Sequence, residues 1–115
     1  MWIMVSGPYH TGSTDPEVWV ENLHKLNVVA YEILRKGHVP IIGVNLALPI
    51  IESAGQQMYE AVMMPLSLKL TDRCDAVLRI GGPSKGADQE VQLFKLRGLP
   101  IYRKLDEIPD NSVPK

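Results

Sequence analysis

The chain has 115 residues, of which 45% are apolar and 22% charged, enough apolar residues for the core of one domain. Its net charge of −1 gives no electrostatic basis for binding nucleic acid or an anionic membrane, so neither is expected as a partner. Cys74 is the only cysteine, which excludes a disulfide framework and predicts a buried packing residue. No apolar run approaches membrane-spanning length, and residues 1–5 are too short for a secretory signal, so a cytoplasmic protein is expected.

The first half of the chain opens with a predicted buried strand at Trp2–Ser6. A loop rich in glycine, hydroxyls and rings follows at residues 7–14. Asp15 is then a typical N-cap and Pro16 a typical first helical residue. Apolar residues recur at helical spacing from there to Gly37, where a basic last turn and a glycine predict the end of the helix.

The middle of the chain is predicted to alternate in the same way. Residues 38–44 form a second buried strand, and residues 45–55 are expected to be irregular because Pro49 lies inside them. A helix is predicted over residues 56–72 and a strand over 75–80.

The last elements are a helix from the N-cap Ser84 to about Arg97 and a strand at residues 99–102. A single domain is therefore expected over residues 1–105. Residues 106–115 contain several helix breakers and caps and are predicted to be a frayed C-terminal tail.

Strands that alternate with helices predict an α/β fold: one parallel, flavodoxin- or Rossmann-like sheet of about four to five strands with helices on both faces. Right-handed crossovers place all the loops that follow strands at one edge of such a sheet. The loop at 7–14, the region of Asn45 and the loop at 81–86 are expected to meet there, at the edge where open α/β sheets bind ligands.

Glu90 is the most informative residue at this edge. The chain runs from an apolar strand through Gly81 and Gly82 into the helix that Ser84 caps, so Glu90 falls on the early turns of that helix. On a helical projection it lies about 60° from the centre of the apolar stripe, at its border, where packing would half cover a carboxylate. The alternative is an ordinary glutamate placed to interact with the helix dipole.

Other polar residues are expected beside Glu90, namely Tyr9, His10, Asn45 and Ser84. The glycine-rich turn suits a phosphate or a polar sugar, but Lys85 precedes Gly86, so the spacing is neither a P-loop nor a dinucleotide fingerprint. His10 is either an acid–base group or an exposed polar loop residue, and the second interpretation is favoured. His38 and Asp75, at strand starts, are interpreted first as structural, and three methionines (Met58, Met63 and Met64) as helix packing.

Taken in order, these motifs resemble the nucleoside 2-deoxyribosyltransferase-like superfamily, in particular its small bacterial members. The resemblance spans nearly the whole chain. The matching residues are Val5-Ser6-Gly7-Pro8-Tyr9, Asn22, residues 35–40, Cys74-Asp75-Ala76-Val77-Leu78, Ser84, Gly86-Ala87, Glu90 and residues 98–101.

The resemblance implies a retaining N-glycosidic reaction in which Glu90 attacks the anomeric carbon of a deoxyribose and expels the nucleobase. A second base (transferase) or water (hydrolase) then takes the sugar. Tyr9 would orient the nucleophile or contact the sugar. The expected substrate-binding residues are Gly7, Pro8, Asn45, Asp75, Gly82, Ser84 and Gly86. The ligand would be a small nucleoside or nucleotide, with no metal or other cofactor, and the resemblance implies a homo-oligomer whose subunits can share sites.

One departure from the family pattern concerns the acid that helps protonate the leaving base. Its expected position, about two helical turns before Asp75, is occupied by Ser67, and Asp72 or Asp88 are the possible substitutes. Two alternatives stay open. One is a non-catalytic module of the same fold that binds a nucleotide or sugar phosphate. The other is a phosphoribohydrolase of the lysine-decarboxylase-like group. Residues 81–90 are loosely similar to the glycine-rich loop of that group.

Overall fold

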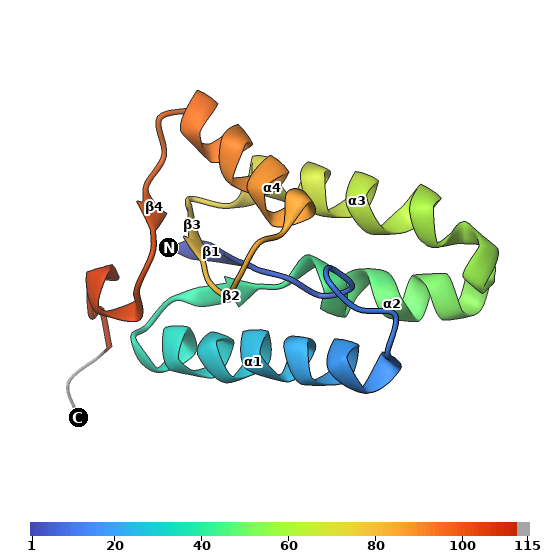
Figure 1. Ribbon diagram of the computed structural model, residues 1–115. Coiled ribbons are helices and arrows are strands. Elements are labelled where there is room, and N and C mark those ends of the chain that lie inside the picture. The colour runs from blue at the N-terminus through green and yellow to red at the C-terminus, as the bar shows by residue number, and fades with distance from the viewer. Residues whose placement is uncertain (113–115) are drawn as a thin grey trace.

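The computed structural model describes residues 1–112 and consists of a sheet between helices (Figure 1). In chain order the helices and strands are β1 (Trp2–Ser6), α1 (Pro16–Arg35), β2 (Val39–Ile41), α2 (Gly43–Ala54), α3 (Tyr59–Leu70), β3 (Ala76–Arg79), α4 (Lys85–Leu96) and β4 (Ile101–Tyr102). Short 3₁₀ turns at Gln56–Met58 and Thr71–Arg73 flank α3, so the predicted helix at 56–72 is observed as three consecutive helical pieces.

The sheet has four strands in the order β2-β1-β3-β4, all parallel. This confirms the predicted fold class. The chain moves from β1 to β2 on one side and from β3 to β4 on the other, so the direction of winding changes between β1 and β3. Open α/β sheets bind ligands at such a switch point, at the carboxyl ends of the strands. Ser6 and Arg79, which pair across β1 and β3, mark that point here.

Helices cover both faces of the sheet, as predicted. On one face α1 contributes Leu26 and Ile33, which pack on the strand residues Ile3 and Leu78. On the other face α4 contributes Val91 and Phe94, which pack on Met4, Val77 and Cys74. Phe94 is fully buried, and burying a phenylalanine side chain contributes about 1.5–3 kcal/mol to stability. Both helices are thereby held firmly against the strands whose ends form the site.

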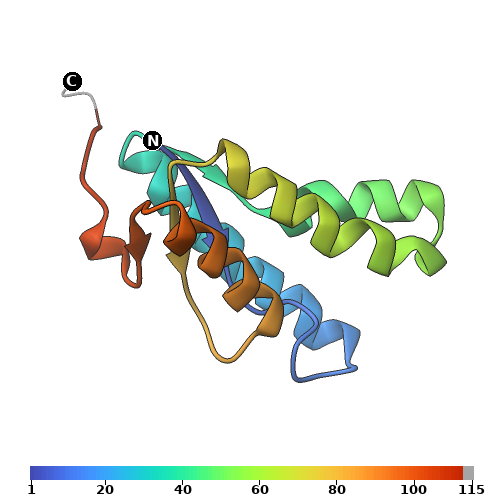
Figure 2. The same cartoon turned by 90° about the horizontal axis from the view of Figure 1, so that it is seen from above.

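The α2–α3 pair forms a helical hairpin that projects beyond the carboxyl edge of the sheet (Figures 1 and 2). The prediction that residues 45–55 are irregular is wrong, because α2 runs through Pro49. Proline removes one backbone donor, but Ala47 and Ile51 of α2 pack with Met63 of α3 into a separate apolar cluster. Tertiary packing therefore outweighs the local signal of the proline.

Both predicted N-caps are confirmed. The Asp15 carboxylate accepts from the backbone N–H of Glu17, and the Ser84 hydroxyl accepts from that of Ala87. The strands after β1 are shorter than predicted, and β2 ends at Ile41 because Gly43 already begins α2.

The predicted fraying of the tail is wrong for residues 106–112. A 3₁₀ turn forms at Leu105–Glu107, and Ile108 joins the core beside α1. His38, buried, contacts the Met1 amino group and the Pro109 carbonyl through its two ring nitrogens, which confirms its structural role. Residues 113–115 of the predicted tail lie outside the described residues.

Cys74 is buried, as predicted, and burial raises the pKa of its thiol to about 11. A thiol that stays protonated at neutral pH is a poor nucleophile, so the packing interpretation is confirmed. Among residues 1–112 there is no helix with both the length and the apolar character needed to cross a bilayer.

Candidate active site

A pocket with a volume of about 130 Å³ opens at the switch point, between the loop after β1, the N-terminal turns of α4 and the α2–α3 hairpin. This is below the usual range of roughly 300–1,000 Å³ for small-molecule sites, so the pocket can enclose one ring of a ligand rather than a whole nucleotide. Its polar lining consists of Tyr9, His10, Thr11, Tyr59, Glu60, Ser67, Ser84 and Glu90. Its other walls are Val5, Gly7, Leu26, Ile42, Gly43, Val44, Met63, Met64, Gly86 and Ala87.

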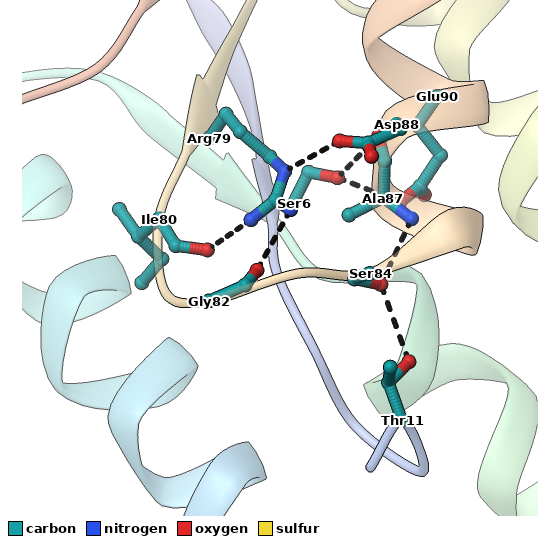
Figure 3. A network of polar contacts seen from close by, with 9 residues as sticks. All are labelled: Ser6, Thr11, Arg79, Ile80, Gly82, Ser84, Ala87, Asp88 and Glu90. Carbon is teal, nitrogen blue, oxygen red and sulfur yellow. Dashed lines mark hydrogen bonds and ion pairs between the residues drawn. The ribbon is translucent and has the colours of Figure 1, made fainter.

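Glu90 is the carboxylate at the inner wall. Because Ala87, Val91 and Phe94 hold α4 against the sheet, Glu90 is only 9% exposed, more buried than its border position predicted. Its Oε1 accepts a hydrogen bond of 2.7 Å from the hydroxyl of Ser6, the last residue of β1 (Figure 3). The Ser6 hydroxyl also lies 3.3 Å from the carbonyl of Ala87.

Burial raises the pKa of Glu90 to about 7, although the Ser6 hydrogen bond and the charge of Arg79 both favour the ionised form. A carboxylate with this pKa is present in both protonation states near neutral pH. Perturbed groups of this kind in a cleft are characteristic of functional sites, although structural networks also produce them.

The loop after β1 is fixed by α1. The Asn22 side chain donates to the Tyr9 carbonyl at 2.8 Å, and the Trp19 indole donates to the Ser13 carbonyl at 2.8 Å. Tyr9 therefore lines the pocket as predicted, and burial raises its pKa. Among residues 1–112 no hydrogen bond joins Tyr9 to Glu90, and the hydroxyl that orients Glu90 comes from Ser6, which the sequence analysis did not single out.

His10 is not the exposed polar residue that the sequence favoured. Its ring is half-buried and stacks with Tyr9 and Tyr59 at centroid distances of 4.6 and 4.5 Å, while Trp19 lies 3.8 Å away. Burial lowers the pKa of His10, and the charge of Glu60 partly opposes this. These contacts could not be read from the sequence, because Tyr59 belongs to a distant helix.

Ser84 and Gly86 line the pocket at the start of α4, as predicted. The Ser84 hydroxyl caps α4 and lies 3.5 Å from the hydroxyl of Thr11, so the loops after β1 and β3 meet at this point (Figure 3). Gly7 also lines the pocket.

Arg79 is a buried charge that the sequence analysis missed. It is 8% exposed and donates to the carbonyls of Ile80 and Gly82 and to the carboxylate of Asp88 (Figure 3). The guanidinium thereby fixes the turn at Gly81, where φ is +79°, a conformation suited to glycine. A single arginine inside an otherwise apolar strand was the available sequence signal.

Four expected substrate-binding residues do not reach the pocket. Gly82 and Pro8 lie nearby: Gly82 borders a shallow hollow beside Arg79 and Asp88, and Pro8 packs against Gly81. Asn45 is exposed on α2 and exchanges hydrogen bonds with Asn27. Asp75 is at the opposite edge of the sheet, where its carboxylate accepts from the backbone of Trp2 at 2.7 Å, because a residue that precedes a parallel strand lies at the amino end. This supports the structural interpretation of Asp75.

Ser67, at the expected position of the acid, is buried where α3 crosses α2. A β-carbon on Gly43 would collide with the Ser67 hydroxyl, so the two helices touch there. Asp72 is exposed and Asp88 pairs with Arg79, and neither lines the pocket. The second carboxylate that does line it is Glu60, on the first turn of α3.

The arrangement offers one oriented carboxylate, a ring system and hydroxyl groups around a small concave space. Within residues 1–112 no three His, Cys, Asp or Glu side chains gather in a way that would hold a metal ion. The chain matches no model of a known protein family, and no curated protein matches it.

Proposed function

We propose that this chain cleaves or transfers the N-glycosidic bond of nucleosides or nucleotides, with Glu90 as the nucleophile. The observation that carries the proposal is the hydrogen bond from Ser6 to Glu90 inside a pocket at the switch point of the sheet. A carboxylate held there can stabilise the oxocarbenium-like transition state of a sugar and can bond to its anomeric carbon.

The geometry assigns different tasks to the two carboxylate oxygens. Oε1 accepts from Ser6, whereas Oε2 has no hydrogen-bond partner among residues 1–112. Oε2 would attack C1′ of the sugar, the C1′–N bond would break, and the electron pair would leave with the base. The Ser6 hydrogen bond fixes the direction of attack and favours the ionised carboxylate.

In the second half of the reaction, water or a second base would attack C1′ from the face that the first base left, and Glu90 would depart as a carboxylate. Two inversions at C1′ give net retention. The pocket volume suits the sugar ring, and the base would then lie beside Tyr9 and Tyr59, which also line the pocket. Ser84 and Gly86 would contact a sugar hydroxyl or a 5′-phosphate.

We further propose a homo-oligomer, since the pocket encloses only part of such a substrate and a second copy can complete it. Four apolar side chains on α1 are exposed by half or more: Val20, Val28, Tyr31 and Leu34. Exposed apolar side chains that gather on one helix are typical of interfaces. Light scattering on the intact chain tests this, with a dimer or larger assembly expected and a monomer at all concentrations contradicting it.

The reaction is tested by incubating the chain with 2′-deoxynucleosides and their 5′-monophosphates, with and without a second free base, and separating the products by chromatography. Release of the base is expected from the native chain and not from Glu90→Gln. The matched control is Glu52→Gln, an exposed glutamate of α2 outside the pocket, which should leave turnover unchanged.

Equal turnover by the native chain and Glu90→Gln would contradict the proposal. Tight binding of a nucleotide without any release of base would favour the non-catalytic module. A strong preference for ribonucleotides would favour the phosphoribohydrolase.

A further inference from the structure

The imidazole of His10 is the centre of an aromatic cluster at the pocket. Its plane makes angles of 18° with Tyr9, 3° with Tyr59 and 30° with Trp19, at centroid distances of 4.6, 4.5 and 3.8 Å. Rings this close and this nearly parallel lie over one another's faces, because coplanar rings at such distances would collide. The cluster therefore fixes the orientation of the imidazole.

Stacking leaves the edge of the imidazole available. Neither ring nitrogen of His10 has a hydrogen-bond partner within the described part of the chain, while both nitrogens of His38 do. His10 also lines the same pocket as Glu90. An imidazole with covered faces and an unpaired polar edge is suited to proton transfer at the pocket.

Glu60 provides a carboxylate at the same pocket. It lies on the first turn of α3, next to Tyr59, and lines the pocket. Its charge acts on His10 in the direction that favours the imidazolium. His10 and Glu60 thus bring an imidazole and a carboxylate to the pocket from two elements other than the one that carries Glu90.

We propose that His10 is the acid that protonates the leaving nucleobase, with Glu60 as the carboxylate that supports its charged form. This inference rests on the proposed function. As Glu90 bonds to C1′ and the C1′–N bond breaks, the electron pair of that bond goes to the base, and the proton of the imidazolium goes to a ring nitrogen or the carbonyl oxygen of the base. In the second step the attacking water or base returns a proton to the neutral imidazole.

The other candidate groups lack either the acidity or the placement for this task. Ser67 is packed against Gly43 and carries a hydroxyl, which is a very weak acid. Asp72 and Asp88 do not line the pocket. His10 therefore supplies the proton that the departure at Ser67 leaves unassigned.

The protonation states of His10 and Glu90 together set the pH dependence of kcat/KM. Burial lowers the pKa of His10 below its ordinary value of 6.5, and burial raises that of Glu90 to about 7. The other titratable groups facing His10 are Glu60 and the hydroxyls of Tyr9 and Tyr59. Burial raises the pKa values of the two tyrosines. The reaction needs His10 protonated and Glu90 ionised. We therefore expect kcat/KM to follow a bell-shaped curve with its optimum between the pKa values of these two groups.

The test compares two substrates with the same sugar. 2′-Deoxyguanosine needs protonation of its base, whereas 7-methyl-2′-deoxyguanosine already carries a positive charge on the base and leaves without an acid. His10→Phe keeps an aromatic ring in the stack and removes both nitrogens. We expect it to lower kcat/KM for 2′-deoxyguanosine by about 10²–10⁴-fold, with less than about a threefold change for the methylated substrate.

The matched control is His24→Gln, an exposed histidine of α1, for which both substrates should react as with the native chain. A second readout is independent of turnover: Glu60→Gln should lower the pKa of His10 measured by NMR titration. Base release from 2′-deoxyguanosine by Glu60→Gln should fall in parallel.

Equal losses on both substrates in His10→Phe would overturn the inference and leave Glu90 as nucleophile, because a merely structural role does not depend on the leaving group. An unchanged rate on 2′-deoxyguanosine would overturn it as well. The proposed function itself fails, and the inference with it, if Glu90→Gln still releases the methylated base at the native rate.

Discussion

The hydroxyl of Ser6 and the carboxylate of Glu90 lie 2.7 Å apart, although 84 positions separate them in the chain. Ser6 ends β1 and Glu90 lies in the second turn of α4, and both are buried. The contact joins the end of β1 to α4 at the switch point of the sheet. It is also the only described polar contact that fixes the direction of the Glu90 side chain.

Ser6→Ala should raise the pKa of Glu90 further, because the carboxylate loses the hydrogen bond that favours its ionised form. A larger fraction of Glu90 is then protonated at pH 7, and kcat/KM at that pH should fall about tenfold. The pH dependence of kcat/KM checks this, with the basic limb moved to higher pH. Ser6→Thr retains a hydroxyl and is the control; equal profiles for Ser6→Ala and the native chain would contradict the assignment.

Glu90→Gln should stabilise the fold at pH 8 and not at pH 4. The pKa of Glu90 is raised from 4.5 to about 7 in the folded chain, so the folded state binds the extra proton and its stability is lost as the pH rises through 7. The loss is roughly 3 kcal/mol. Urea unfolding at both pH values measures it, with Glu52→Gln as control. The same free-energy difference between Glu90→Gln and the native chain at pH 4 and pH 8 would contradict it.

Gly43→Ala should destabilise the α2–α3 hairpin, because the new β-carbon meets the Ser67 hydroxyl. Overpacking of this kind costs about 1–3 kcal/mol. Ser67→Ala removes the oxygen and should recover part of the loss in the double variant. Thermal unfolding of the two single variants and the double variant measures the coupling, and strictly additive effects would show that the two residues do not touch.

Arg79→Leu should cost more stability than Asp88→Asn, although the two residues form one ion pair. Arg79 is buried and satisfies two backbone carbonyls, whereas the Asp88 side chain is 68% exposed. Hydrogen bonds to a charged group contribute about 1.5–3 kcal/mol each, while an exposed ion-pair partner contributes less than about 1 kcal/mol. Chemical unfolding checks this order. A larger loss of stability in Asp88→Asn would contradict the role of Arg79 in fixing the Gly81 turn.

Local signals predicted much of the fold. Asp15 with Pro16 and Ser84 with the following apolar stripe mark helix starts that the structure confirms, since caps depend on neighbouring residues alone. Pro49 misled the prediction of α2, because the packing that sustains that helix comes from α3. Long-range contacts of this kind leave no local trace.

In the candidate site too, the residues with local sequence signals could be predicted and those with distant partners could not. Glu90 was identifiable because its helix, its stripe and the preceding turn are contiguous in sequence. Ser6 and the ring cluster around His10 were not, because their partners lie on other elements. Asp75 is different, because it precedes β3 and a residue before a parallel strand lies at the amino edge of the sheet, opposite the pocket. The direction of the strand is therefore enough to exclude Asp75 from the site.

The proposed function depends on a bond between Glu90 and the anomeric carbon of a sugar. A 2′-deoxy-2′-fluoroarabinosyl nucleoside tests it most directly, because the fluorine destabilises the oxocarbenium-like transition states and slows loss of the sugar from the enzyme. Intact mass spectrometry should show one added 2-deoxy-2-fluoroarabinosyl group, and peptide mapping should place it on Glu90 and find none in Glu90→Gln. Base release with no adduct, or an adduct on any other residue, would contradict the claim.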